Sequence, residues 1–218
     1  MDQLLKNFPN LRIPPDMLPH FNIAPTQGVL AIANDHPDRL GVFHWGLVPS
    51  WAKDPGIGSR LINARAETLA EKPAFRTALA RRRCLVPADG FYEWRSEGGK
   101  LKTPMYIRMK SGEPLAFAGL WDVWHSADGS ELPSLTIITT APNSLMETIH
   151  NRMPAIVQPK DYDRWLSPNE TAAGELADVL GPYPAEKMTA HPVSPRVNKP
   201  GYDAADCIDQ AEPQTLFG

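Results

Sequence analysis

The chain has 218 residues and a formal net charge of −3, and 42% of its residues are hydrophobic while 22% are charged. This balance is close to that of ordinary globular proteins, so it excludes wholesale disorder and a uniformly cationic surface. The 23 prolines, about twice the ordinary share of roughly 5%, exclude long helical bundles and coiled coils, because proline breaks helix interiors.

An irregular, extended lead-in is predicted over residues 7–28, which contain five prolines. The short segments that follow are rich in β-branched or aromatic residues and are bounded by Gly, Pro, Asp or Ser, a pattern typical of strands. We predict strands at residues 29–33, 42–45, 84–87, 91–95, 105–109, 115–120 and 135–139.

Short helices are predicted at residues 73–82, 144–149, 161–165 and 170–180. Pro73 suits the first turn of a helix, and Pro142 with Asn143 gives a start signal for the next one. The long strand–helix–strand spacing of a parallel sheet is missing. The sequence therefore predicts one α+β domain over residues 1–218, with a twisted, mainly antiparallel, barrel-like β-sheet and short peripheral helices.

Charge is distributed unevenly along the chain. Residues 60–83 contain seven basic and two acidic residues, whereas residues 160–218 contain five basic and ten acidic ones. The basic stretch is either a solvated helix face or a surface that binds phosphate groups. Arginine is well suited to the second role, because its guanidinium donates two hydrogen bonds to one phosphate, and Arg76 and Arg83 are candidates for it.

Two clusters in the first third of the chain are candidate binding residues. Trp45 and Trp51 flank a Gly/Pro turn, and both are core aromatics or else Trp51 offers a face on which a base stacks. Asn63 is either the cap of a following helix or, together with Arg65, part of one edge of a site. In the second case the amide orients a sugar oxygen and the guanidinium holds a phosphate.

Two further clusters supply titratable groups. In a strand, Phe91 and Glu93 point to one face, so Glu93 is an acid on a strand that should be largely buried. Burial would raise the pKa of Glu93 toward the range useful for proton transfer, and an exposed edge position is the alternative. His150 lies between a helix end and a turn stopped by proline, where a structural hydrogen bond is the commoner role. Sequence spacing does not place it beside Glu93.

The two cysteines, Cys84 and Cys207, lack the spacing of a zinc site and do not indicate a disulfide scaffold. The histidines also lack metal-ligand spacing, so we predict no metal and no cofactor. We find no apolar run that approaches the length needed to span a bilayer and no signal-peptide pattern, so a cytoplasmic protein without a membrane partner is expected.

Several short motifs occur in order across most of the chain. They are Asn-Ile-Ala-Pro-Thr at 22–26, the tryptophan-flanked segment 45–51, Asn-Ala-Arg-Ala-Glu-Thr at 63–68, Arg-Cys-Leu-Val-Pro at 83–87, Asp-Gly-Phe-Tyr-Glu-Trp at 89–94, Phe-Ala-Gly-Leu-Trp at 117–121, Ile-Ile-Thr-Thr at 137–140, Ile-His-Asn-Arg-Met-Pro at 149–154 and Val-Asn at 197–198. Each is weak alone, but together they make the chain resemble the SOS response-associated peptidase family, also called abasic-site processing proteins.

The resemblance implies a compact α+β fold around a barrel-like sheet, with a groove for single-stranded DNA that carries abasic sites. It implies a monomer that acts on the nucleoid without a small-molecule cofactor. In this family an N-terminal cysteine, exposed by removal of the initiator methionine, forms a Schiff base with the abasic sugar. Its thiol then closes a thiazolidine, which leaves a DNA–protein crosslink that shields the lesion.

The resemblance also assigns roles to individual residues. Asn63 corresponds to the amide that orients the cysteine and the sugar, and Glu93 to the acid/base of ring opening and imine formation. His150 corresponds to the residue that assists proton transfer in lyase chemistry and crosslink reversal. The residues that correspond to contacts with DNA phosphates or flanking bases are Pro25, Trp51, Arg65, Trp94 and Arg152.

The chain departs from the family at its start, since the family begins Met-Cys-Gly-Arg and this chain begins Met1-Asp2-Gln3. We expect that an upstream start codon was missed; the alternatives are a deliberately shortened chain and a natural variant that only binds DNA. Neither Cys84 nor Cys207 can replace the cysteine, because thiazolidine closure requires an amine and a thiol on one residue. We therefore expect no stable crosslink from these 218 residues.

Two other function classes stay open. A non-covalent single-stranded DNA-binding module would bind intact and abasic strands alike, with affinity that falls steeply as salt rises. A peptidase is the other class, with its own N-terminus as the one natural substrate, because no Ser–His–Asp or metal set in the sequence supports a general protease.

Overall fold

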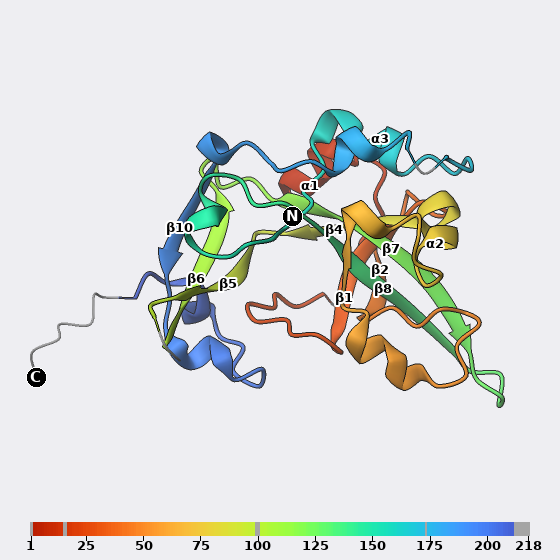
Figure 1. Ribbon diagram of the computed structural model, residues 1–218, viewed down its shortest axis with the longest axis horizontal. Helices are drawn as coiled ribbons and strands as arrows, with labels where there is room; N and C mark the ends of the chain where they lie inside the picture. Colours follow the sequence, from red (N-terminus) through yellow and green to blue (C-terminus); the bar gives the residue numbers. More distant parts are fainter. Residues whose placement is uncertain (1, 15–16, 99–100, 173, 212–218) are drawn as a thin grey trace, which may run out of the picture.

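The computed structural model describes residues 2–14, 17–98, 101–172 and 174–211, and its largest element is a seven-stranded sheet (Figure 1). Five strands follow one another in the order β2 (Gly41–Trp45), β1 (Gly28–Ala33), β4 (Arg83–Ala88), β7 (Leu115–His125) and β8 (Glu131–Thr140). Because β2 also pairs with β8, these strands close into a barrel. The predicted α+β fold with a barrel-like sheet is thereby confirmed.

The far half of β8 carries the two remaining strands of this sheet, β3 (Asn63–Arg65) and β9 (Met153–Pro154). The pairings of β8 with β2 and with β3 are parallel, and the other pairings between the named strands are antiparallel. The expectation of a mainly antiparallel sheet therefore holds, and both parallel pairings involve β8.

A second, antiparallel sheet has the order β10 (Met188–Pro192), β6 (Lys102–Met109) and β5 (Gly90–Ser96), and it lies to the left of the barrel in Figure 1. It packs against the barrel through Phe91 of β5, whose ring meets Phe117 of β7 edge-on with centroids 5.7 Å apart. The predicted strands all occur, whereas β3, β9 and β10 were not predicted.

The helices are short, as the proline content predicts. The α-helices are α1 (Asp2–Asn7), α2 (Arg76–Arg81) and α3 (Tyr162–Trp165). The 3-10 helices are η1 (Pro55–Arg60), η2 (Ala66–Thr68), η3 (Met146–Thr148), η4 (Pro159–Asp161), η5 (Ala177–Leu180), η6 (Ala185–Lys187), η7 (Pro195–Asn198) and η8 (Ala205–Ile208). Among the described residues, no helix is both long and apolar enough to cross a membrane.

The predicted helices are shortened rather than misplaced. The segment predicted at 144–149 contains only the 3-10 turn η3, whose N-cap Leu145 has no side-chain cap, although the Asn143 Oδ1 accepts a hydrogen bond of 2.9 Å from the Met146 amide. The helix predicted at 170–180 is wrong over most of its length, because the 3-10 helix η5 begins only at Ala177, and residue 173 lies outside the described residues.

Two hydrophobic clusters lie on opposite faces of the closed sheet. Phe43 and Trp121 belong to strands that are not neighbours, yet their ring centroids are 6.1 Å apart, so their cluster fills the barrel interior. This inner core continues into the second sheet, since it includes Met105 and Ile107 of β6. The outer core packs α2 and α3 against the outside of the barrel.

Arg83, at the start of β4, is fully buried beneath α2 and α3. Its guanidinium donates hydrogen bonds of 2.6–3.2 Å to five backbone carbonyls, those of Leu79, Ala80, Trp165, Ser167 and Asn169. Among the described residues no carboxylate pairs with it, and burial lowers the pKa of its guanidinium. The prediction that Arg83 contacts DNA is therefore wrong, because all of its donors are turned inward to join α2 to the segment after α3.

We predict that Arg83→Met lowers the free energy of unfolding by at least about 3 kcal/mol, because it leaves several buried carbonyls without donors. Urea denaturation followed by tryptophan fluorescence measures this. The matched control is Arg81→Met, which removes an exposed ion pair with Glu170 and should cost less than about 1 kcal/mol. Equal urea midpoints for the two variants would contradict the structural role of Arg83.

Candidate active site

Glu93 lies on β5 with its side chain 24% exposed, on the face that looks toward the barrel. Strand alternation places it on the same face as Phe91, which packs on the inner core. Tyr92 points the other way, and its hydroxyl donates a hydrogen bond of 2.6 Å to the Phe21 carbonyl. Although β5 is an edge strand of its sheet, the side chain of Glu93 is only 24% exposed because it faces the barrel, as expected for a largely buried acid.

His150 lies beside Glu93, with 3.8 Å between its Nδ1 and the Glu93 Oε1. Burial raises the pKa of Glu93, while the positive charge of a protonated His150 opposes this shift. The Arg152 amide donates to the His150 Nδ1 at 3.2 Å. The Arg152 carbonyl also lies 3.2 Å from the same nitrogen, so the backbone of Arg152 offers the His150 Nδ1 a partner whichever tautomer the neutral imidazole adopts.

Asn63 and Arg65 lie on β3 and flank the buried Ala64. In register, Asn63 pairs with Ile137 and Arg65 with Thr139 of β8. Ile137 belongs to the inner core, so the exposed side chains of Asn63 and Arg65 lie on the inner face of the sheet. Glu93 points toward this face from β5. The alternative that Asn63 caps a helix is wrong, because the N-cap position of η2 is Arg65 and no side chain caps it.

Arg152 connects the His150 segment to β3 and η2. Its Nη1 and Nη2 donate to the two oxygens of Glu67 at 2.7 and 2.9 Å, and Nη2 also donates to the Thr139 carbonyl at 2.6 Å. Thr139 is the register partner of Arg65. The contacts therefore bring Glu93, His150, Arg152 and Arg65 together around the end of β8, which sequence spacing could not establish.

Glu67 was not singled out by the sequence reasoning, although it lies within the motif at 63–68. Arg152 donates two hydrogen bonds to it and holds the pKa of its carboxyl below the ordinary value, and the nearby charge of Arg65 acts in the same direction. The one signal available from the sequence was an acid two residues after Arg65, within a predominantly basic stretch.

Three further predicted residues present exposed or half-exposed surface. Trp51 is 60% exposed, which excludes a core position for it, whereas Trp45 is half-buried and donates to the Ile62 carbonyl. Pro25 is exposed in a turn where Thr26 adopts a φ of 73°. Trp94 is half-buried, and its indole N–H donates to Asn198 at 2.7 Å.

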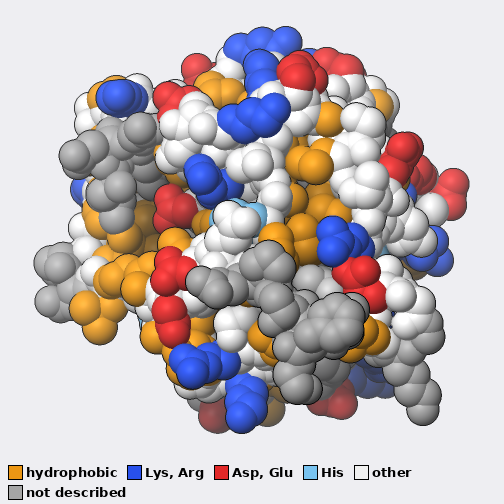
Figure 2. Space-filling model, turned by 90° about the vertical axis from the view of Figure 1, so that its left-hand side faces the viewer, with side chains coloured by type: hydrophobic (Ala, Val, Ile, Leu, Met, Phe, Trp, Pro, Cys, Tyr) orange, Lys and Arg blue, Asp and Glu red, His pale blue; other side chains and the backbone are white. Residues whose placement is uncertain are grey.

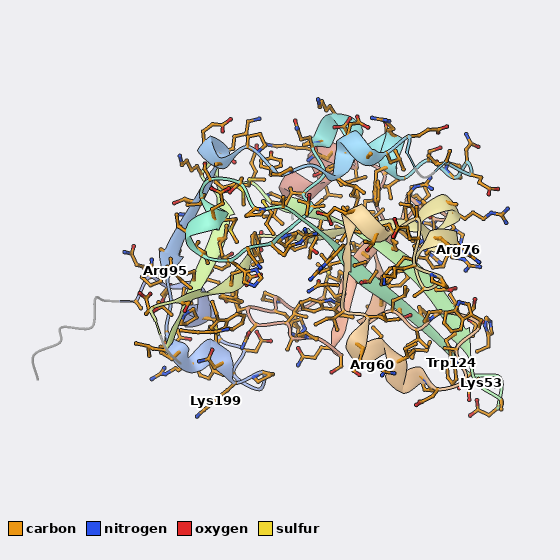
Figure 3. The ribbon with its side chains drawn as sticks, viewed as in Figure 1. Lys53, Arg60, Arg76, Arg95, Trp124 and Lys199 are labelled. Carbon is orange, nitrogen blue, oxygen red and sulfur yellow. The ribbon has the colours of Figure 1, made fainter. Side chains whose placement is uncertain are left out.

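Arg76 does not join this group. It belongs to α2, whose Ala78 and Leu79 pack on the outer core rather than the inner one. Figure 3 shows Arg76 across the barrel from Arg95 of β5. On the side formed by the three-stranded sheet, Figure 2 shows basic side chains interspersed with acidic ones. The charge of this side of the molecule as a whole therefore does not identify which basic side chains bind phosphate.

The site is an open surface with no protein thiol among its described residues. Both Cys84 and Cys207 are buried, and burial raises the pKa of the Cys84 thiol. Within the described ranges there is no group of three His, Cys, Asp or Glu side chains that could hold a metal ion. A cavity of about 500 Å³ lies elsewhere, lined by residues such as Lys6, Tyr162 and Tyr183.

Comparison with known proteins gives consistent results. Residues 1–200 match the family model described as SOS response associated peptidase (SRAP). The abasic site processing protein YoqW of Bacillus subtilis is 48% identical over 88% of this chain and 86% of its own length. The abasic site processing protein HMCES of Rattus norvegicus is 32% identical over 95% of this chain and 69% of its own length.

Two solved structures share the fold. A crystal structure of a protein from Bacteroides thetaiotaomicron has a TM-score of 0.78 and 34% identity, and the match covers 86% of this chain and 82% of that one. A crystal structure of a protein from Bordetella bronchiseptica has a TM-score of 0.77 and 27% identity, and the match covers 88% of this chain and 95% of that one.

We predict that Glu93→Gln raises the urea midpoint at pH 8. A raised pKa means that protonated Glu93 contributes stability below its unfolded pKa, ordinarily 4.5, and that this contribution is lost as the pH rises through the folded pKa. Glutamine imitates the protonated acid, so its advantage should be largest at high pH and vanish near pH 4.

The matched control is Glu97→Gln. Hydrogen bonds from Arg95 and Thr103 lower the pKa of this exposed carboxyl, so the small effect of this variant should have the opposite sign. A Glu93→Gln variant that is less stable than the parent at pH 8 would refute the assignment of a burial-raised pKa.

Proposed function

The chain belongs to the SOS response-associated peptidase family, and on this basis we propose that it processes abasic sites in single-stranded DNA as part of the DNA-damage response. The observation that carries the proposal is the contact between Glu93 and His150 beside the exposed Asn63 and Arg65. An acid whose pKa is raised by burial and a neighbouring imidazole are the two proton carriers that carbonyl–amine chemistry at an abasic sugar requires.

Glu93 is the proton donor of the proposed reaction. The ring-opened sugar presents an aldehyde, and an amine attacks its carbon to give a carbinolamine. A new C–N bond has then formed, and the hydroxyl leaves as water when Glu93 delivers a proton to it. Because burial raises the pKa of Glu93, a larger fraction of this acid is protonated near neutral pH than of an exposed glutamate.

His150 and Asn63 have supporting roles in this proposal. His150, with its Nδ1 3.8 Å from the Glu93 Oε1, accepts or returns protons during strand cleavage and crosslink reversal. Asn63 extends from a strand, a rigid support, and its amide donates to a sugar oxygen. A sugar without its base needs little energy to leave the stack, so an open surface suffices to receive it.

Arg65, Trp51, Pro25 and Trp94 form the proposed contact surface for the DNA strand. The exposed Arg65 guanidinium binds a backbone phosphate, and the face of Trp51, which is 60% exposed, stacks on a flanking base. We propose that the chain works as a single-domain monomer without a metal or small-molecule cofactor.

The nucleophile of the covalent reaction is, in this proposal, an N-terminal cysteine. Thiazolidine closure needs the amine and the thiol on the same residue, and the thiols of Cys84 and Cys207 are buried within the fold. The chemistry of Asn63, Glu93 and His150 is therefore separable from crosslinking, which depends on what precedes the described fold.

We predict that the 218-residue chain gives no heat-stable complex with an abasic single-stranded oligonucleotide on a denaturing gel. The same chain preceded by Met-Cys-Gly-Arg should give one after removal of the methionine, because cysteine then provides both groups. The control replaces that cysteine by serine, which keeps the amine and removes the thiol. A heat-stable band from the 218-residue chain would sink the assignment of the nucleophile.

We also predict that Asn63→Ala and Glu93→Gln slow abasic-site processing by about 100-fold, the usual scale for loss of a general acid. Affinity for intact single-stranded DNA and its dependence on salt should change little, because neither residue is assigned to a phosphate. Glu131→Gln, at the exposed start of β8, is the carboxylate control. If binding and processing fell together, a non-covalent DNA-binding module would be the better description.

A further inference from the structure

Arg152 is held in place almost completely by protein groups. Its side chain is only 22% exposed, and a carboxylate and a carbonyl occupy three of its N–H donors: two bind Glu67 and one binds the Thr139 carbonyl. Its Nε is buried and has no hydrogen-bond partner among the described residues. A guanidinium has five N–H donors. In this arrangement only one accessible N–H, on Nη1, remains for an incoming group.

This geometry limits what Arg152 can do for DNA. A bidentate phosphate contact uses two parallel donors, and Glu67 already occupies the fork formed by Nη1 and Nη2. A phosphate would have to displace the Glu67 carboxylate or accept a single hydrogen bond. The arrangement therefore favours a structural link between η2 and the segment before β9 over a phosphate site.

The same residue controls the position of His150 through its backbone. The Arg152 amide and the Arg152 carbonyl both lie 3.2 Å from the His150 Nδ1, so this backbone gives the imidazole a partner in either tautomer. His150 is itself exposed, and its Nδ1 also lies 3.8 Å from the Glu93 Oε1. Its ring is therefore held mainly by a backbone that the Arg152 side chain fixes.

Glu67 holds the Arg152 side chain from the solvent side. Its side chain is 52% exposed, so it lies at the surface, but its partner is largely buried. Removing it would leave a buried guanidinium without its carboxylate, a more serious change than the loss of an exposed ion pair. Arg152 would then be free to shift, together with its amide.

We propose that Glu67 is a positioning residue for His150, acting through the side chain and backbone of Arg152. Glu67 touches no reacting atom in this role. It fixes the place of the imidazole relative to Glu93. The catalytic consequence rests on the proposed function, whereas the effect on the imidazole exists without DNA and can be measured separately.

The first experiment examines the protein without DNA. Nitrogen-15 NMR of the imidazoles should give His150 ring shifts in Glu67→Ala that differ from those of the parent chain, because the ring moves relative to Glu93. Glu67→Gln should restore the parent shifts in part, because an amide oxygen still accepts one hydrogen bond. Asp178→Ala, which frees Arg164 on the outer surface, is the control and should leave His150 unchanged.

The second experiment measures strand cleavage at an abasic site. Glu67→Ala should slow it roughly 10- to 100-fold, the scale of a small misplacement of a reacting group, while affinity for intact DNA stays within about twofold. In an Arg152→Ala background, Glu67→Ala should have no further effect, because the two residues act in series.

Unchanged His150 ring shifts in Glu67→Ala would overturn the proposal, as would additive effects of the two alanine variants. A gain in DNA affinity would also overturn it, because Glu67 would then be a competitor of phosphate for Arg152. If the parent chain cleaved no abasic strand, the proposed function would fail, and the NMR result would still decide the link between Glu67 and His150.

Discussion

Strand β8 pairs with different neighbours along its length, and both the barrel and the candidate site depend on this change of partners. Its first part pairs with β7 on one edge and, at Ser134 and Leu135, with β2 on the other, which closes the barrel. Its last part pairs with β3 and β9 instead. A strand edge bonds one neighbour at a time, so β3 can join only where β2 has ended. This succession places Asn63, Arg65 and Arg152 around the same short length of backbone.

The closed barrel also decides which residues are available for chemistry. A side chain at Gly119 would place its Cβ 2.7 Å from the Cys84 Sγ, so glycine is needed where β4 and β7 face each other across the ladder. Cys84 is a packing residue in this interior, with its thiol kept protonated because burial raises its pKa. The reactive groups are confined to the rim, where the inner core ends and the second sheet begins.

The sequence predicted the elements whose patterns are long enough to read. The strands β5 and β8 carry consecutive aromatic or β-branched residues, and burial on at least one face leaves that signal in the sequence. Strand β3 has only three residues, of which Ala64 alone is buried, so it shows no periodicity. The contact between Glu93 and His150 depends on the packing of two sheets and a 3-10 turn, a long-range arrangement that local spacing does not encode. The family resemblance named both residues without that geometry.

The arginines show why residue type alone could not identify the DNA contacts. A guanidinium donates in the same way to a carbonyl, a carboxylate or a phosphate, so the environment selects the partner. Arg83 begins a strand beside the end of α2, where unpaired carbonyls are plentiful, and it is fully buried there. Arg152 is held by Glu67 and Thr139. Arg65 flanks the buried Ala64 on a short strand and remains exposed. Of these three residues, Arg65 alone is exposed, so it is the one whose guanidinium is best placed to bind a phosphate.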